Sequence, residues 1–125
     1  MDRPLRFSQL SPARQTLVRL FQSINYGHIQ NLTVEDQEPL LGNASPVALA
    51  DIRLDVEDPP RVELDVVDFI LCAEVTRLLA LFDKIQNANI SKIEVRAGIP
   101  RRIKIEHQVT EKEISAFVCR EAGRN

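Results

Sequence analysis

The sequence has few of the residues from which most catalytic and metal-binding sites are built. Its 125 residues include two histidines, two cysteines and four glycines. His28 and His107 lack metal-ligand spacing, both to each other and to the cysteines. The glycines stand singly instead of forming a loop that could cradle a phosphate, and no nucleophile elbow surrounds a serine or a cysteine. These absences predict a protein that is not an enzyme, with no catalytic residue, no cofactor and no metal.

The two cysteines, Cys72 and Cys119, lie inside apolar patterns of helical spacing, which is typical of small buried thiols. This usage favours a reducing compartment. Residues 1–10 carry Arg3 and Arg6 without an apolar run behind them, so they lack the pattern of a secretory signal. The longest apolar stretch, residues 66–85, contains five charged side chains, which argues against a membrane-spanning segment. We therefore expect a cytoplasmic protein with no membrane partner.

An internal repeat organises the chain. At a constant offset of 61 residues and without a gap, residues 17–41 align with residues 78–102. The matched positions are Leu17 with Leu78, Leu20 with Leu81, Phe21 with Phe82, Ile24 with Ile85, Ile29 with Ile90, Val34 with Val95 and Pro39 with Pro100. Each copy has the pattern of an amphipathic helix, a tight corner, a strand, a turn and a second strand that begins with proline.

This order predicts an α+β fold built from duplicated helix–strand–strand units. With a hydrophobic fraction of 44%, the chain is expected to form one domain, 1–125. We divide it into a first αββ(β) unit at 11–57, a second αββ unit at 65–109 and a short C-terminal helix at 110–122. Because the strands follow one another through short turns, the sheet should be mostly antiparallel, with the helices on one face.

Local signals place the elements of the first unit. Ser11 and Pro12 are a good N-cap and first residue of a helix, which Gly27 is expected to end in a left-handed conformation. A strand is predicted over 29–35, and a second strand from Pro39. The clearest alternation in the chain predicts a third strand over 51–57, with Ile52, Leu54 and Val56 facing inward.

The second helix is predicted over 66–85, with Asp65 as its N-cap. Its apolar surface extends well beyond the stripe that one core needs, so more than one neighbour should cover it. A partner subunit is an attractive cover, and we expect a homodimer. The candidate interface residues are Phe69, Ile70, Ala73, Ala80 and Leu81.

Charge is unevenly distributed along a chain whose net charge is −2. Residues 35–68 sum to −8, and residues 92–104 sum to +4. Acids near positions 55–58 do not have the spacing of a calcium loop, so we interpret them as a solvated face. The basic segment forms a predicted hairpin whose cations are the candidate contacts for an anion or a partner: Lys92, Arg96, Arg101, Arg102 and Lys104.

Two interpretations of this basic hairpin stay open. Its cations could hold phosphates or an acidic protein surface. No aromatic residue lies among them in the sequence to stack a base, and the chain as a whole is acidic, so nucleic acid is the less favoured ligand. The alternative is that they pair with the acids of residues 51–57, in the same subunit or in a neighbouring one.

The corner at residues 24–29, Ile-Asn-Tyr-Gly-His-Ile, followed by Val-Glu-Asp at 34–36, resembles the helix–corner–strand pattern of the small YezD-like bacterial proteins. The likeness covers about 25 residues, and its repeat at 85–98 lacks the Tyr-Gly pair. Those proteins have no established function, so the resemblance implies a bacterial origin and no particular activity.

Three hypotheses for function follow. The leading one is a small protein-interaction or dimerisation domain, and the alternative is a nucleic-acid or phosphate-binding accessory protein that uses the hairpin 92–104. The third is an enzyme whose residues come together in space, for instance His28, Tyr26 and acids of the predicted third strand.

Overall fold

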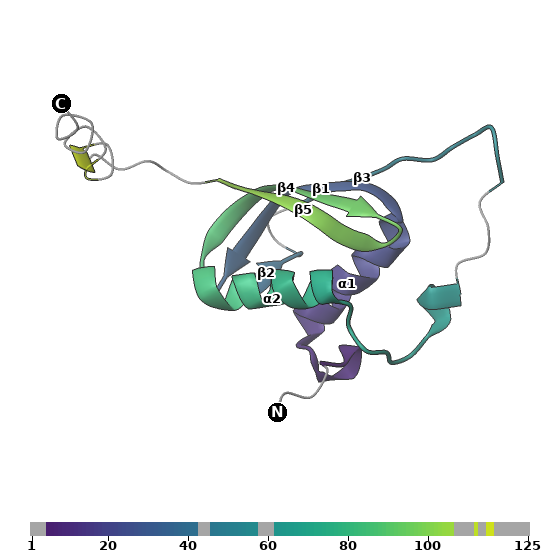
Figure 1. Cartoon of the computed structure of the whole chain (residues 1–125), viewed down its shortest axis with the longest axis horizontal. Helices are drawn as coiled ribbons and strands as arrows, with labels where there is room; N and C mark the ends of the chain where they lie inside the picture. The colour runs from purple at the N-terminus through teal and green to yellow at the C-terminus, as the bar shows by residue number, and fades with distance from the viewer. Residues whose placement is uncertain (1–4, 43–45, 58–61, 107–111, 113–114, 117–125) are drawn as a thin grey trace.

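The computed structural model describes residues 5–42, 46–57 and 62–106, together with residues 112, 115 and 116. The chain runs through η1 (Phe7–Gln9), α1 (Pro12–Ile24), β1 (Tyr26–Glu35), β2 (Glu38–Leu40), β3 (Val47–Ala50), η2 (Val62–Asp65), α2 (Ala73–Ile85), β4 (Ala88–Arg96) and β5 (Ile99–Glu106), where η marks a 3-10 helix. The strands form one antiparallel sheet in the order β2-β1-β4-β5, and β3 also pairs with β1. Both α-helices lie against the same face of this sheet (Figure 1). The predicted α+β fold class is confirmed.

The two helix–strand–strand units correspond closely. Both α-helices have 13 residues, and their bounds differ by the 61-residue offset of the sequence repeat. The C-cap residues Asn25 and Gln86 both take a positive φ, of 65° and 60°. The turn of each hairpin then forms a backbone hydrogen bond with the C-cap residue of the other unit's helix. The Gln37 N–H donates to the Gln86 carbonyl at 2.8 Å, and the Gly98 N–H donates to the Asn25 carbonyl at 2.9 Å.

The register of the central strand pair has the same symmetry. Ile29 lies opposite Ile93, and Leu32 lies opposite Ile90. At the 61-residue offset, Ile29 corresponds to Ile90 and Ile93 corresponds to Leu32. Exchanging the two units therefore converts the first pair into the second. A quasi-twofold axis therefore passes between β1 and β4 and exchanges the two units.

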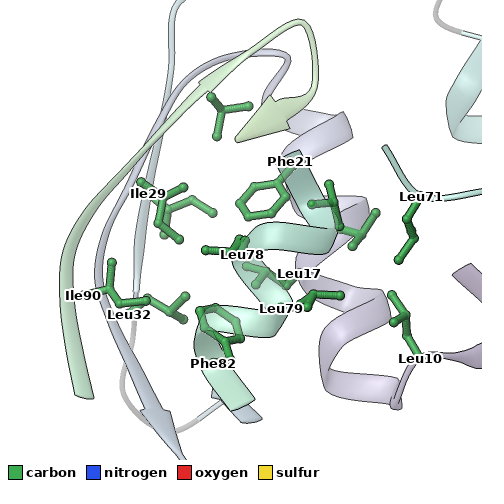
Figure 2. Close-up of a cluster of buried hydrophobic side chains, with 14 of the residues drawn as sticks. Leu10, Leu17, Phe21, Ile29, Leu32, Leu71, Leu78, Leu79, Phe82 and Ile90 are labelled. Atoms are coloured by element: carbon green, nitrogen blue, oxygen red, sulfur yellow. The ribbon is translucent and has the colours of Figure 1, made fainter. Parts of the chain in front are cut away.

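The hydrophobic core lies between the sheet and the two helices. Phe21 and Phe82, which occupy equivalent positions, are both 0% exposed. Figure 2 shows them projecting from α1 and α2 toward the inward side chains of the sheet, among them Ile29, Leu32 and Ile90. The two repeated phenylalanines thus share one core in equivalent surroundings.

The prediction of a helix over 66–85 was wrong for its first seven residues. The helix begins at Ala73 with Cys72 as its N-cap, and Asp65 instead ends the 3-10 helix η2. The intervening backbone binds the N-terminal segment: the Phe7 N–H donates to the Phe69 carbonyl, and the Leu71 N–H donates to the Leu5 carbonyl, both at 2.9 Å. These contacts with residues more than 60 positions away replace the hydrogen bonds that a helix would have made.

The prediction of a strand over 51–57 was also wrong. The third strand, β3, lies just before it and pairs with residues 27–30 of β1. The chain leaves the sheet after Ala50 (Figure 1). Alternation indicates that a segment has one apolar and one polar face, as a strand does. It does not show whether a neighbouring strand is available to pair with that segment.

Smaller differences concern the ends of two elements. β1 begins at Tyr26, so Gly27 lies inside the strand and Asn25 ends the helix. The strand reaches this far because β3 and β4 both pair with it there. Of the predicted C-terminal helix, 110–122, only residues 112, 115 and 116 are described, and they are helical.

Candidate functional site

Residues 51–57, here called the arm, form the most exposed apolar segment of the described chain. Ile52, Leu54 and Val56 are 67%, 94% and 51% exposed. The polar residues between them include Arg53 and Asp55, whose side chains form an ion pair. Hydrogen bonding from Arg53 holds the pKa of Asp55 below its usual value, so this carboxylate is charged at neutral pH. The arm therefore presents three aliphatic side chains and an acidic edge to solvent.

The basic hairpin lies on β4 and β5, and two of its cations form ion pairs with nearby carboxylates. Arg96 pairs with Glu94 at 3.1 Å, and Arg101 pairs with Glu74 of α2 at 2.7 Å. Among the residues that the structure describes, none of the five predicted cations forms an ion pair with an arm carboxylate. The pairing within one subunit that the sequence suggested is therefore absent from the described residues.

The other three cations gather on the face of the sheet that the helices leave open. Arg102 lies opposite Glu94, and Lys92 lies directly opposite Lys104. Within the described residues, Lys92, Arg102 and Lys104 form no ion pair. Like charges directly opposite each other destabilise an antiparallel pair. The position of Lys104 is therefore one where an added carboxylate would be favourable.

The pairing of β1 with β4 brings an aromatic residue to this face, which the sequence did not reveal. Tyr26 lies opposite Arg96 and is 49% exposed, and His28 lies opposite Glu94. The two strands are about 60 residues apart in the chain, so no local pattern signals their register. One consideration against nucleic acid, the lack of an aromatic among the cations, is thereby weakened.

The outer edge of the sheet beside β5 is free among the described strands, because β5 pairs only with β4. A shallow groove of about 210 Å³ runs between this edge and α2. Leu78, Leu81, Pro100 and Ile103 form its apolar walls, and Glu74, Arg77, Arg101 and Arg102 line it as well. Ile103 and Ile105 are only half-buried at this edge, so the hydrophobic layer between sheet and helices is left partly open here.

The predicted interface residues do not share one helix face. Phe69 stacks on Phe7 with ring centroids 4.9 Å apart, and the guanidinium of Arg19 lies over both rings. Ile70 is exposed and forms a β-bridge with Arg6. Ala73 and Ala80 are exposed on α2, whereas Leu81 is half-buried and lines the groove beside β5. Of these five residues, Leu81 is the one that belongs to a candidate docking surface.

A second hollow of about 1160 Å³ lies where residues 50–53, which include the start of the arm, pass the ends of α1 and α2. Its lining includes Tyr26, Asp51, Ile70 and Cys72, but His28 is not part of it. The thiol of Cys72 is free. No group of three or more histidine, cysteine, aspartate or glutamate side chains comes together within the described ranges in a way that could hold a metal ion. The residues suggested for an enzyme are thus not gathered around one hollow.

Comparisons of the chain with models of protein families, with curated proteins and with solved structures give no match in any of the three. Within the described part of the chain, no helix has the length and apolar character needed to cross a membrane.

Proposed function

We propose that the protein is a non-enzymatic interaction domain that associates with a second copy of itself. The observation that carries this proposal is the arm, whose aliphatic side chains Ile52, Leu54 and Val56 are each more than half exposed in the described chain. Soluble proteins seldom expose an extended apolar segment unless another molecule covers it. The half-open core at Ile103 and Ile105 is a second surface of the same kind.

The energies are sufficient for a reversible dimer. Full burial of one valine, leucine or isoleucine side chain contributes about 1.5–3 kcal/mol. A symmetric dimer would bury two arms and thus six such side chains, against an association cost of about 4–15 kcal/mol. The gain of about 9–18 kcal/mol and the cost are of similar size, so we expect a reversible dimer and not a permanent one. The free thiol of Cys72 suits a reducing compartment, and a cytoplasmic location is part of this proposal.

Sedimentation equilibrium of the full chain at low, middle and high micromolar concentrations tests the proposal. We expect a mass that rises with concentration toward twice the 14.2 kDa of one chain. A folded protein that stays at 14.2 kDa over this range contradicts it.

A second candidate function, the binding of phosphates or of a single-stranded nucleic acid, is favoured by one observation. Lys92 and Lys104 face each other across β4 and β5 without a carboxylate between them, on the same open face as Tyr26. Cations and an exposed aromatic on an open sheet face can bind a phosphate backbone and stack a base.

The structure supplies a matched pair of variants for this second candidate. Arg102 and Lys104 form no ion pair within the described chain, whereas Arg101 is paired with Glu74. A labelled oligonucleotide titrated at two salt concentrations should bind more weakly to Arg102→Ala with Lys104→Ala, and nearly unchanged to Arg101→Ala. Absent or salt-insensitive binding contradicts this function.

A further inference from the structure

We propose that the arm of one copy adds to the free edge of β5 of a second copy as an antiparallel strand, and that the second copy's arm does the same in return. This inference rests on the proposed self-association and specifies its contact. An edge strand presents a row of backbone N–H and C=O groups that a further strand can pair with. The arm has the two-residue alternation that such a strand needs on its apolar face.

The charges of the two segments are complementary. The arm carries Asp51, Asp55 and Glu57 against the single base Arg53. The edge strand carries Arg101, Arg102 and Lys104 against the single acid Glu106. Within the described chain the arm carboxylates and the edge cations form no ion pair with one another, so a second copy can bring these opposite charges together.

One antiparallel register brings six of these charged side chains into pairs of opposite sign. It aligns Asp55 with Lys104, Glu57 with Arg102 and Arg53 with Glu106, so that each outward-facing row joins opposite signs. The carboxylate of Asp55 would then lie beside the Lys92–Lys104 pair, which is the position where the sheet accumulates like charges.

The same register places apolar residues together on the inner face. Val56 lies beside Ile103, and Leu54 lies beside Ile105, because the alternation of both segments is in phase. These two isoleucines are the half-buried residues at the open edge of the core, and Ile103 also lines the groove beside α2. The added strand would therefore close the hydrophobic layer between the sheet and α2.

Other alignments lose these matches. A shift of two residues in one direction sets Arg53 opposite Lys104, and a shift in the other direction sets Asp55 opposite Glu106. A shift of one residue turns the aliphatic side chains to the open face. A parallel strand that keeps Asp55 beside Lys104 sets Arg53 beside Arg102.

Charge-reversal variants of the full chain test the contact. We expect Asp55→Lys and Lys104→Glu each to raise the dimer dissociation constant at least about tenfold, because each creates a like-charge row at the interface. The double variant should regain dimerisation. An equimolar mixture of the two single variants should also dimerise. In the mixed dimer, the arm with Asp55→Lys meets the edge with Lys104→Glu, and the other arm and edge both keep their natural charges.

Asp65→Lys is the matched control, because it makes the same change of charge in an exposed residue of the acidic stretch outside the arm. Its dissociation constant should stay within about twofold of that of the natural chain. Circular dichroism of each variant separates loss of pairing from loss of folding.

The outcomes distinguish the two proposals. If the natural chain is a monomer at every concentration, both fail. If it forms a dimer that Asp55→Lys and Lys104→Glu leave unchanged, self-association stands and the strand addition is overturned. The strand addition is also overturned if the two folded, monomeric variants remain monomeric when they are mixed.

Discussion

The packing of β3 against β1 depends on the absence of a side chain at Gly27. A Cβ atom at this position would lie 1.9 Å from the Leu49 carbonyl oxygen and 2.9 Å from the Ala50 Cα. Both neighbours are backbone atoms, so neither can turn away without moving β3. The φ angle of 153° is also one that residues other than glycine rarely adopt. We therefore expect Gly27→Ala to displace β3 from the sheet.

The magnitude follows from two contributions. Separation of β3 near Gly27 loses about two backbone hydrogen bonds, each of which contributes about 0.5–1.5 kcal/mol net. Holding alanine at an unfavourable φ costs about 1–3 kcal/mol. Together the expected loss is about 2–6 kcal/mol, a large part of the roughly 5–15 kcal/mol by which small domains are stable.

Urea unfolding followed by circular dichroism measures this loss, with Gly42→Ala as the control. Nothing lies within 4 Å of a Cβ atom placed at Gly42, so its substitution should change the free energy of unfolding by no more than about 0.5 kcal/mol. Hydrogen exchange at the β3 amides should accelerate in Gly27→Ala before that of the core strands does. Equal unfolding midpoints for the two variants would refute the close approach of β1 and β3.

Two further predictions concern the symmetry of the core and the N-terminal contact. Phe21→Leu and Phe82→Leu should each lower the free energy of unfolding by about 1–2 kcal/mol, because both rings are fully buried. Since the two positions are equivalent, the two losses should agree within about 1 kcal/mol. Urea unfolding in which only one variant is destabilised contradicts this equivalence. The Arg6 guanidinium and the Ser8 N–H lower the pKa of Asp68 from 3.8 to about 2. Because the folded-state pKa is the lower one, the ionised carboxylate stabilises the fold above about pH 4, and this stabilisation is lost as the pH falls toward about 2. Unfolding midpoints of the natural chain should therefore fall more steeply between these pH values than those of Asp68→Asn, and parallel curves would contradict the contact.

The parts of the fold that local signals determine could be predicted from the sequence. Ser11 accepts a hydrogen bond from the Arg14 N–H at the start of α1, as its position before Pro12 predicted. The repeated apolar positions predicted both helices, and the second one ends at Ile85 as predicted. Cap residues and apolar periodicity act within a few residues, so a single sequence contains the necessary information.

The parts that depend on distant partners could not be predicted. Residues 66–71 continue the apolar character of α2, but the N-terminal segment binds Phe69 and Leu71 through backbone hydrogen bonds and the Phe7–Phe69 stack. The aromatic on the open face was missed for the same reason, because Tyr26 reaches Arg96 only through the pairing of β1 with β4. In both cases the deciding contact joins residues about 60–70 positions apart.

The quasi-twofold symmetry indicates where the specific function of this chain lies. Equivalent positions in the two units form the core, exchange the turn-to-helix hydrogen bonds and set the register of the central strands. These roles stabilise the fold, and each unit performs them alike. Residues 47–57, which comprise β3 and the arm, take no part in these equivalent contacts. They contain five of the eleven large apolar side chains that are exposed in the described chain. The fold common to the two units does not require this apolar surface, and its exposure to water is unfavourable. Binding to another molecule is the simplest explanation for its presence. The asymmetric segment is therefore the part of the molecule in which variants should separate association from stability.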